Sequence, residues 1–254
     1  MAKGPKPSVK VGDKFTTKEG YEVEVVEYNG AFDVIVKFGN GFEKRVEASH
    51  LRHGRVKNPF HRSVYGVGYY GDGVYKAKSE GKHTKAYRTW LNMFVRCYDE
   101  KELKRNPTYK ECYVCEEWHN FQVFAKWFYQ QPNHDKQGFD LDKDLIVLGN
   151  KIYGPDYCSF VPHQINTLLT GHGLARGSWP QGVCYSKRYK SYRAKVNKGE
   201  GKSFHIGSYS NPEDAFKPYA EEKEKFVKQR AEEYKNVIHP KVYENLMLYK
   251  VKPA

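Results

Sequence analysis

The stretch that most constrains this chain is residues 139–169, FDLDKDLIVLGNKIYGPDYCSFVPHQINTLL. Apolar and polar side chains alternate over residues 139–145, which is typical of a half-buried strand, and residues 150–156 are rich in turn-forming residues. Residues 159–161 predict a second short strand, and residues 163–169 predict a helix with its apolar side chains on one side. The order strand, loop, strand, helix therefore predicts a ββα unit.

This order would bring an acidic strand end close to a polar side chain of the helix. Asp142 or Asp144 would supply the carboxylate, and Asn166 would supply an amide. Oxygen donors of this kind suit a hard divalent ion that keeps several waters. We expect a metal site at Asp142 and Asn166, and the alternative is an ordinary ββα packing unit with surface acids.

The same residues resemble the ββα-metal core of HNH endonucleases, especially the phage-encoded homing-type enzymes. In that family Asp-His ends the first strand, an Asn-rich loop follows, and the helix carries Asn or His. On this pattern Asp142 takes the place of the strand metal ligand, Asn166 that of the helical ligand, and residues 157–162 that of the second strand. The resemblance implies Mg²⁺ or Mn²⁺ as the cofactor.

The sequence departs from that family at the general base, because Lys143 stands where the family has His. A lysine at a strand end beside two aspartates would keep a raised pKa and hold its proton. By position, the catalytic residue is therefore Lys143. If the base is not this lysine, the nearest candidates in sequence are His163 and His134.

The composition favours a polyanionic partner. The chain has 254 residues, with 43 Lys and Arg against 30 Asp and Glu and a formal net charge of +13, and nucleic acid is the commonest soluble polyanion. The mean hydropathy is −0.82, and neither an apolar run of membrane-spanning length nor a signal peptide is evident. We expect an intracellular protein without membrane contact, in the host cytoplasm if it is phage-encoded.

Five cysteines leave two alternatives for the thiols. Cys112 and Cys115 form a C-x-x-C pair that could hold zinc with Cys97, His119 or Cys158. A second such pair is missing from the sequence, so we expect reduced, buried thiols rather than a zinc site.

The N-terminal third reads as strands followed by a link. Residues 9–57 predict a small SH3-like β-barrel that either contacts nucleic acid or serves as a structural cap, because four alternating segments are separated by turn signals. These segments are residues 14–16, 21–26, 32–38 and 42–46. Residues 58–83 predict a basic linker rich in Gly and Tyr, which either follows a phosphate backbone or simply joins two domains.

Helical segments surround the ββα unit. Thr84 is expected to cap a helix that reaches residue 98, in which aromatic and aliphatic side chains recur at helical spacing. A second amphipathic region covers residues 114–131. These segments also resemble the phage family, and we expect them to support the ββα unit within one domain, residues 84–170.

Beyond a Gly-rich linker at residues 171–178, residues 178–236 predict a three-stranded sheet and a helix. The helix is expected to start at Asn211 and Pro212. Gly182-Val183, Tyr192-Arg193-Ala194 and Ile206-Gly207-Ser208-Tyr209 resemble the AP2/ERF-type DNA-binding domain, whose sheet enters the major groove of DNA. Lys195 and His205 depart from residues common in that family. A solvated basic sheet is the alternative.

Alternation along the strands places a set of basic and aromatic side chains at or near the face that would meet DNA, although only alternate residues of a strand point one way. The predicted DNA-binding residues are Tyr185, Lys187, Arg188, Lys190, Tyr192, Arg193, Lys195, Lys202 and His205. Residues 237–254 form a tail with a short helix that docks on its own domain or on another subunit.

Together these features predict an α+β fold: an SH3-like β-barrel, an HNH-like ββα middle domain with helices, and an AP2-like three-stranded sheet plus helix. The expected function is double-stranded DNA binding with metal-dependent nicking or cleavage. The alternative is a catalytically inactive DNA-binding protein built on a degenerate HNH core.

Overall fold

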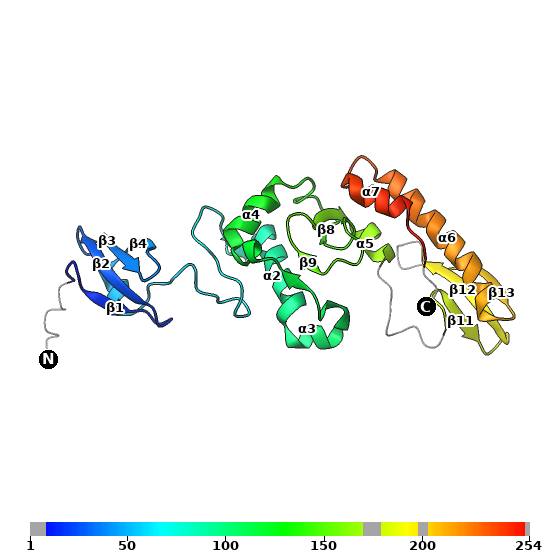
Figure 1. Cartoon of the computed structure of the whole chain (residues 1–254), viewed down its shortest axis with the longest axis horizontal. Coiled ribbons are helices and arrows are strands. Elements are labelled where there is room, and N and C mark those ends of the chain that lie inside the picture. Colours follow the sequence, from blue (N-terminus) through cyan, green and yellow to red (C-terminus); the bar gives the residue numbers. More distant parts are fainter. Residues whose placement is uncertain (1–8, 170–178, 198–202, 252–254) are drawn as a thin grey trace. The chain divides into compact units, whose positions relative to one another are not determined.

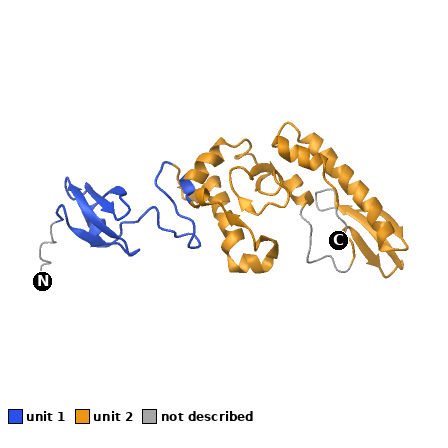
Figure 2. Cartoon of the chain, viewed as in Figure 1, with its two compact units in different colours: residues 1–74, 120–122 blue, residues 75–119, 123–254 orange. Residues whose placement is uncertain are grey.

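The computed structural model describes residues 9–169, 179–197 and 203–251 and is a mixed α+β protein with several small sheets (Figure 1). Residues 1–74 with 120–122 form one compact unit, and residues 75–119 with 123–254 form the second (Figure 2). The predicted linker at residues 171–178 and the predicted DNA contact Lys202 lie outside the described residues.

The first unit is built on an antiparallel sheet in which the four predicted strands are confirmed. Val23 and Val25 of one strand and Val34 and Val36 of the next are fully buried, because alternate side chains point to one face. In the described residues the first and fourth strands are the two edges, so the sheet is open rather than a closed barrel. Its elements are β1 (Lys14–Thr16), β2 (Glu22–Tyr28), β3 (Val34–Phe38), β4 (Glu43–Val46) and the short helix α1 (Ala48–Arg52).

The second unit begins with helices that share an aromatic core. Thr84 caps the first helix as predicted, since its hydroxyl oxygen accepts the Tyr87 N–H at 3.2 Å. Trp90 is buried and donates its indole N–H to the Trp118 carbonyl at 2.7 Å. The elements are β5 (Lys78–Ser79), β6 (Lys82–His83), α2 (Lys85–Tyr98), α3 (Glu100–Arg105), η1 (Pro107–Tyr109), β7 (Tyr113–Val114), η2 (Glu116–His119) and α4 (Phe121–Gln130).

The predicted order strand, strand, helix is confirmed next along the chain. Strand β8 (Phe139–Asp142) pairs antiparallel with β10 (Ser159–Pro162), and α5 (His163–Leu169) follows directly. Strand β9 (Ile152–Tyr153) lies in the loop between them and pairs parallel with β7. Phe160 of β10 packs on Phe128 of α4 with ring centroids 5.4 Å apart, so α4 supports this element as expected.

The C-terminal sheet consists of three antiparallel strands covered on one face by a long helix. Strands β11 (Val183–Ser186), β12 (Ser191–Asn197) and β13 (Ser203–Tyr209) follow in that order, and α6 (Pro212–Glu233) begins with Asn211 as its cap. Gly182 has φ +76°, and a Cβ on it would lie 2.1 Å from the Tyr219 ring of α6. Glycine at this position therefore allows the chain to turn into β11 and the helix to approach closely.

Helix α6 belongs to two cores. Near its start, Ala215 and Tyr219 are buried against Val183 and Ala194 of the sheet. Near its end, Val227 and Ala231 pack in a second core with β10, α5 and α7 (Pro240–Met247). The other buried residues of this second core are Leu145, Ile146, Val161, Ile165, Ile238, Val242 and Leu246. The predicted tail helix therefore docks within its own chain, on the ββα element.

Candidate functional site

The strand register sets which side chains share a face of the ββα element. Asp142 lies opposite Ser159, and Asp140 lies opposite Val161. Val161 packs with Ile165 of α5 in one core. Because side chains alternate along a strand, Asp140 and Asp142 share the face on which α5 packs.

Asp142, the predicted strand ligand, terminates its own strand. Its Oδ1 accepts the backbone N–H groups of Asp144 and Leu145, each at 2.8 Å. These bonds turn the chain after Asp142, which is why the strand ends there rather than at residue 145 as predicted. Burial raises the pKa of the Asp142 carboxyl, and the two N–H groups offset this only in part.

Lys143, the residue in the general-base position, points into the protein. Its side chain is 7% exposed, and its amine donates to the Asp144 carboxylate and, at 3.0 Å, to the Asn150 carbonyl. Burial lowers the pKa of Lys143, but the hydrogen bond to Asp144 and the charge of that residue outweigh burial and leave the pKa raised. The amine is therefore a structural cation and has no free lone pair with which to accept a proton.

His163, the other predicted catalytic residue, meets an acid that the sequence reasoning missed. Its Nδ1 lies 2.6 Å from Asp140 Oδ2; the His163 side chain is exposed and the Asp140 side chain is about half-exposed. In the neutral imidazole, a carboxylate in this position favours the tautomer with the proton on Nδ1, which leaves Nε2 as the acceptor. His134 is placed differently, since its Nδ1 bonds the Gln131 carbonyl at 2.8 Å and its ring packs on Phe128.

Asn166, the predicted helical ligand, lies three residues after His163, so the two share one side of α5. Within residues 9–169, 179–197 and 203–251, no hydrogen bond joins Asn166 to Asp142, and no group of three or more His, Cys, Asp or Glu side chains that could hold a metal is present. One carboxylate oxygen and one amide oxygen fit Mg²⁺ or Mn²⁺ only if most of its coordination shell is water.

The thiols near the C-x-x-C pair are shielded from solvent to different degrees. Cys97, Cys112 and Cys158 are buried and Cys115 is partly buried. Burial raises the pKa of Cys97 to about 12 and raises the pKa values of the other three. Without a metal these thiols favour the protonated form, and a zinc ion would have to displace their protons to bind.

The C-terminal sheet presents basic side chains on the face that α6 leaves open. Ala194 and Val196 of β12 are buried under α6. Arg193 and Lys195 alternate with them along the strand and therefore point to the opposite face. Lys195 is paired with His205 of β13. Three of the predicted DNA-binding residues, Arg193, Lys195 and His205, therefore lie together on one open surface, which we call the basic face.

The other predicted contacts divide between the helix side and a turn. Tyr192 packs in the core beneath α6, and the Tyr185 ring lies 5.1 Å from it, so these two tyrosines do not lie on the basic face. Lys187, Arg188 and Lys190 lie between β11 and β12, in the turn that borders the sheet.

Tyr189 in this turn is a candidate contact that the sequence reasoning missed. Its side chain is 60% exposed, and the guanidinium groups of Arg188 and Arg193 lie 5.3 Å and 5.7 Å from its ring centroid. A tyrosine beside two arginines suits stacking and phosphate contact. The sequence Lys-Arg-Tyr-Lys was a usable signal, but it fell in a turn, where strand alternation predicts nothing.

Comparison of the chain with protein-family models, curated proteins and solved structures gave no match. Among the described helices, none combines the length and the apolar character needed to cross a bilayer.

Proposed function

We propose that this protein binds double-stranded DNA through the basic face of the β11–β13 sheet. The observation that carries the proposal is the placement of Arg193, Lys195 and His205 on the one face of the sheet that α6 does not cover. Basic side chains projecting from a sheet can reach phosphates and guanine edges in the major groove. The net charge of +13 favours the same partner.

The order of parts supports a more specific proposal, a protein like the phage HNH homing endonucleases with an AP2-like C-terminal domain. A four-stranded sheet, a ββα element supported by aromatic helices, and a three-stranded sheet with one helix follow in the expected sequence. In this proposal the first unit corresponds to the SH3-like domain, and the basic face is the major-groove reader.

Arg193→Ala and Lys195→Ala test the basic face. Each is expected to weaken binding of a labelled duplex by about 1 kcal/mol or more and to lower the salt slope by about one, because a phosphate or base contact is lost. Lys217→Ala is the matched control, since Lys217 is an exposed lysine on α6, which covers the opposite face. Equal affinities for all three variants and the unaltered chain would remove the basic face as the binding surface.

A second candidate function, metal-dependent hydrolysis of a DNA strand, is favoured by the His163–Asp140 pair. Asp140 would orient the imidazole, and His163 Nε2 would accept a proton from the water that attacks phosphorus. Asp142 and Asn166 would hold the metal, which would stabilise the charge on the leaving oxygen. Lys143 takes no part in the chemistry, because its amine is protonated and enclosed.

Nicking of supercoiled plasmid in Mg²⁺, Mn²⁺ or EDTA tests this candidate. Hydrolysis predicts metal-dependent nicking that is lost in Asp142→Ala and Asn166→Ala and reduced in His163→Ala, while Lys151→Ala retains it as an exposed control. Binding of the plasmid without nicking under any metal would assign the chain to the alternative, an inactive DNA-binding protein.

A further inference from the structure

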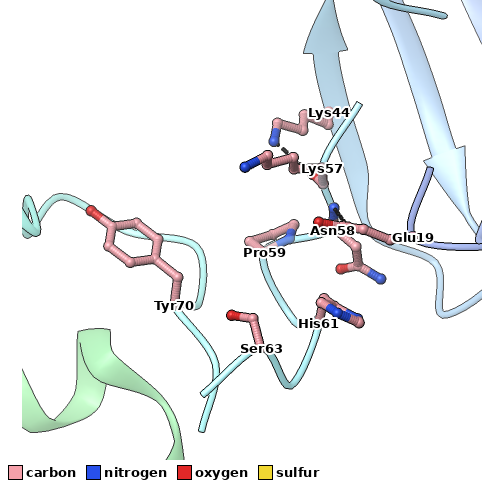
Figure 3. Close-up of a pocket in the computed structure, with 8 residues that line it drawn as sticks. All are labelled: Glu19, Lys44, Lys57, Asn58, Pro59, His61, Ser63 and Tyr70. Atoms are coloured by element: carbon pink, nitrogen blue, oxygen red, sulfur yellow. Dashed lines mark hydrogen bonds between the residues drawn. The ribbon is translucent and has the colours of Figure 1, made fainter. Parts of the chain in front are cut away.

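The first unit contains a pocket that the proposed function does not use. It has a volume of about 380 Å³ and lies where the chain leaves the four-stranded sheet. Figure 3 shows the residues that line it: Glu19, Lys44, Lys57, Asn58, Pro59, His61, Ser63 and Tyr70. The volume is within the range of small-ligand sites in proteins.

Two lysines form the positive part of this pocket. The Lys44 amine donates to the Lys57 carbonyl at 2.9 Å, which fixes the position of this side chain near the start of β4. Both amines point away from the strands in Figure 3. Burial lowers the pKa of Lys44, and the charge of Lys57 lowers it further, while Asp72 and Glu19 act in the opposite direction. Two ammonium groups close enough to affect each other gain stability when an anion lies between them.

The Glu19 carboxylate in the pocket already accepts a hydrogen bond from the protein backbone. Glu19 Oε2 accepts the backbone N–H of Asn58 at 3.0 Å, and this bond is drawn in Figure 3. The carboxylate therefore fixes the start of the segment that carries the remaining lining residues. The formal charges of Lys44, Lys57 and Glu19 sum to +1, so the lining is still net positive.

Further hydrogen-bonding groups complete the lining. His61 Nδ1 pairs with the Tyr21 hydroxyl at 3.1 Å, which holds the imidazole against the sheet. Ser63 contributes an exposed hydroxyl, and the Tyr70 side chain closes the far side. Ammonium groups beside a hydroxyl and an imidazole are the donors that commonly hold phosphate oxygens.

We propose that this pocket binds a phosphoryl group through Lys44 and Lys57. The group would come either from the backbone of duplex DNA or from a free phosphate ester such as a mononucleotide. The first source rests on the proposed DNA binding, whereas the second stands without it.

The test measures both sources with the whole chain and the variants Lys44→Gln and Lys57→Gln. Lys57 is exposed, so its replacement removes charge without opening the core. Lys44→Arg retains the charge, and Lys14→Gln is the matched control, because Lys14 is an exposed lysine of the same sheet and does not line the pocket. Binding of a short labelled duplex is followed by fluorescence anisotropy across salt concentrations, and binding of adenosine 5′-monophosphate and pyrophosphate is followed by calorimetry.

A backbone phosphate in the pocket predicts about fivefold weaker duplex binding and a salt slope reduced by about one for each glutamine variant, with Lys44→Arg and Lys14→Gln close to the unaltered chain. A free phosphate ester predicts unchanged duplex binding and loss of the calorimetric signal in the same two variants. The proposal is overturned if neither ligand distinguishes the glutamine variants from the chain with Lys14→Gln. Failure of the Arg193 and Lys195 variants alone would count against the basic face and leave this pocket standing.

Discussion

At the scale of single residues, the lysine in the general-base position has a structural role. Lys143 donates to Asp144 and Asn150, and its amine lies 5.8 Å from the Tyr153 ring centroid. These contacts tie the end of β8 to the loop that carries β9. A buried cation that satisfies a carboxylate and a carbonyl stabilises the loop and does not act as a base.

Replacement of this lysine should therefore cost stability. Lys143→Met is expected to lower the free energy of unfolding by about 1–3 kcal/mol, because the Asn150 carbonyl loses its charged donor. Lys151→Met, which removes an exposed ion pair with Glu111, should cost less than about 1 kcal/mol. Urea unfolding followed by circular dichroism measures both values. Equal losses would show that the Lys143 contacts stabilise the fold no more than an exposed ion pair does.

A second buried lysine predicts a pH-dependent stability. Lys223 on α6 is 5% exposed, and among the described residues its amine has no hydrogen-bond or ion-pair partner. Burial lowers its pKa to about 8, whereas a lysine in the unfolded chain has a pKa of about 10.4. Between these two values the unfolded chain holds a proton that the folded chain has released, so the contribution of Lys223 to stability rises with pH in that window.

Lys223→Met should accordingly stabilise the protein at neutral pH. The expected gain in unfolding free energy is about 2 kcal/mol at pH 7, where the buried amine must be charged, and it should fall toward zero near pH 10. Lys225→Met, at an exposed position of the same helix, should change stability little at either pH. Thermal melts at the two pH values provide the measurement, and a gain that does not depend on pH would contradict the assignment of the burial cost to charge.

At the scale of elements, α6 packs on two parts of the chain, residues 84–170 and 178–236, that we predicted to be separate domains. Its first turns pack on the β11–β13 sheet, and its last turns pack with α5 and α7. In α7, Asn245 Nδ2 donates to the carbonyls of Leu145 and Ile146 at 2.9 Å and 3.0 Å. The C-terminal segment therefore completes the core of the ββα element.

Loss of the Asn245 amide should destabilise the second unit. Asn245→Ala is expected to lower the free energy of unfolding by about 1–3 kcal/mol, because two partly buried carbonyls lose their donor. Lys241→Ala changes an exposed side chain of the same helix and should have an effect below about 0.5 kcal/mol. Hydrogen exchange at residues 145–146 offers a local readout, and unchanged protection there in Asn245→Ala would show that α7 does not hold this loop.

Elements with a periodic pattern or a capping residue were predictable from the sequence. The strands of the first sheet followed from alternation, and α2 and α6 followed from Thr84 and Asn211 as caps. The parallel pairing of β7 with β9 was not predictable, because two-residue strands carry no periodic signal. The docking of α7 was also open, since an amphipathic helix does not specify which apolar surface covers it.

In the candidate site, too, local patterns were predictable from the sequence and tertiary contacts were not. Alternation placed Arg193 and Lys195 on one face of a strand, which required only the local period of two. The pairing of Asp140 with His163 required the register of β8 with β10, and the enclosure of Lys143 required the path of the loop back to Asn150. Contacts set by tertiary structure leave no spacing signal in the chain.

At the scale of the whole molecule, the excess of positive charge is the property on which the proposed binding of duplex DNA depends. The chain has a net charge of +13, and both units contain candidate phosphate contacts: the basic face and its bordering turn in the second, and Lys44 and Lys57 in the first. If several of these side chains contact phosphates, each releases condensed counterions. Affinity for duplex DNA should therefore fall steeply as salt concentration rises.

The most direct measurement is the salt dependence of binding between the whole chain and a labelled duplex, followed by fluorescence anisotropy. Each phosphate contact adds about −0.9 to the slope of log K against log salt, so the account predicts saturable binding at low ionic strength with a slope of about −3 or steeper. The Arg193→Ala and Lys195→Ala variants should show shallower slopes, and Lys217→Ala should match the unaltered chain. A chain that ignores duplex DNA at low ionic strength, or binds it with no salt dependence, would contradict the account.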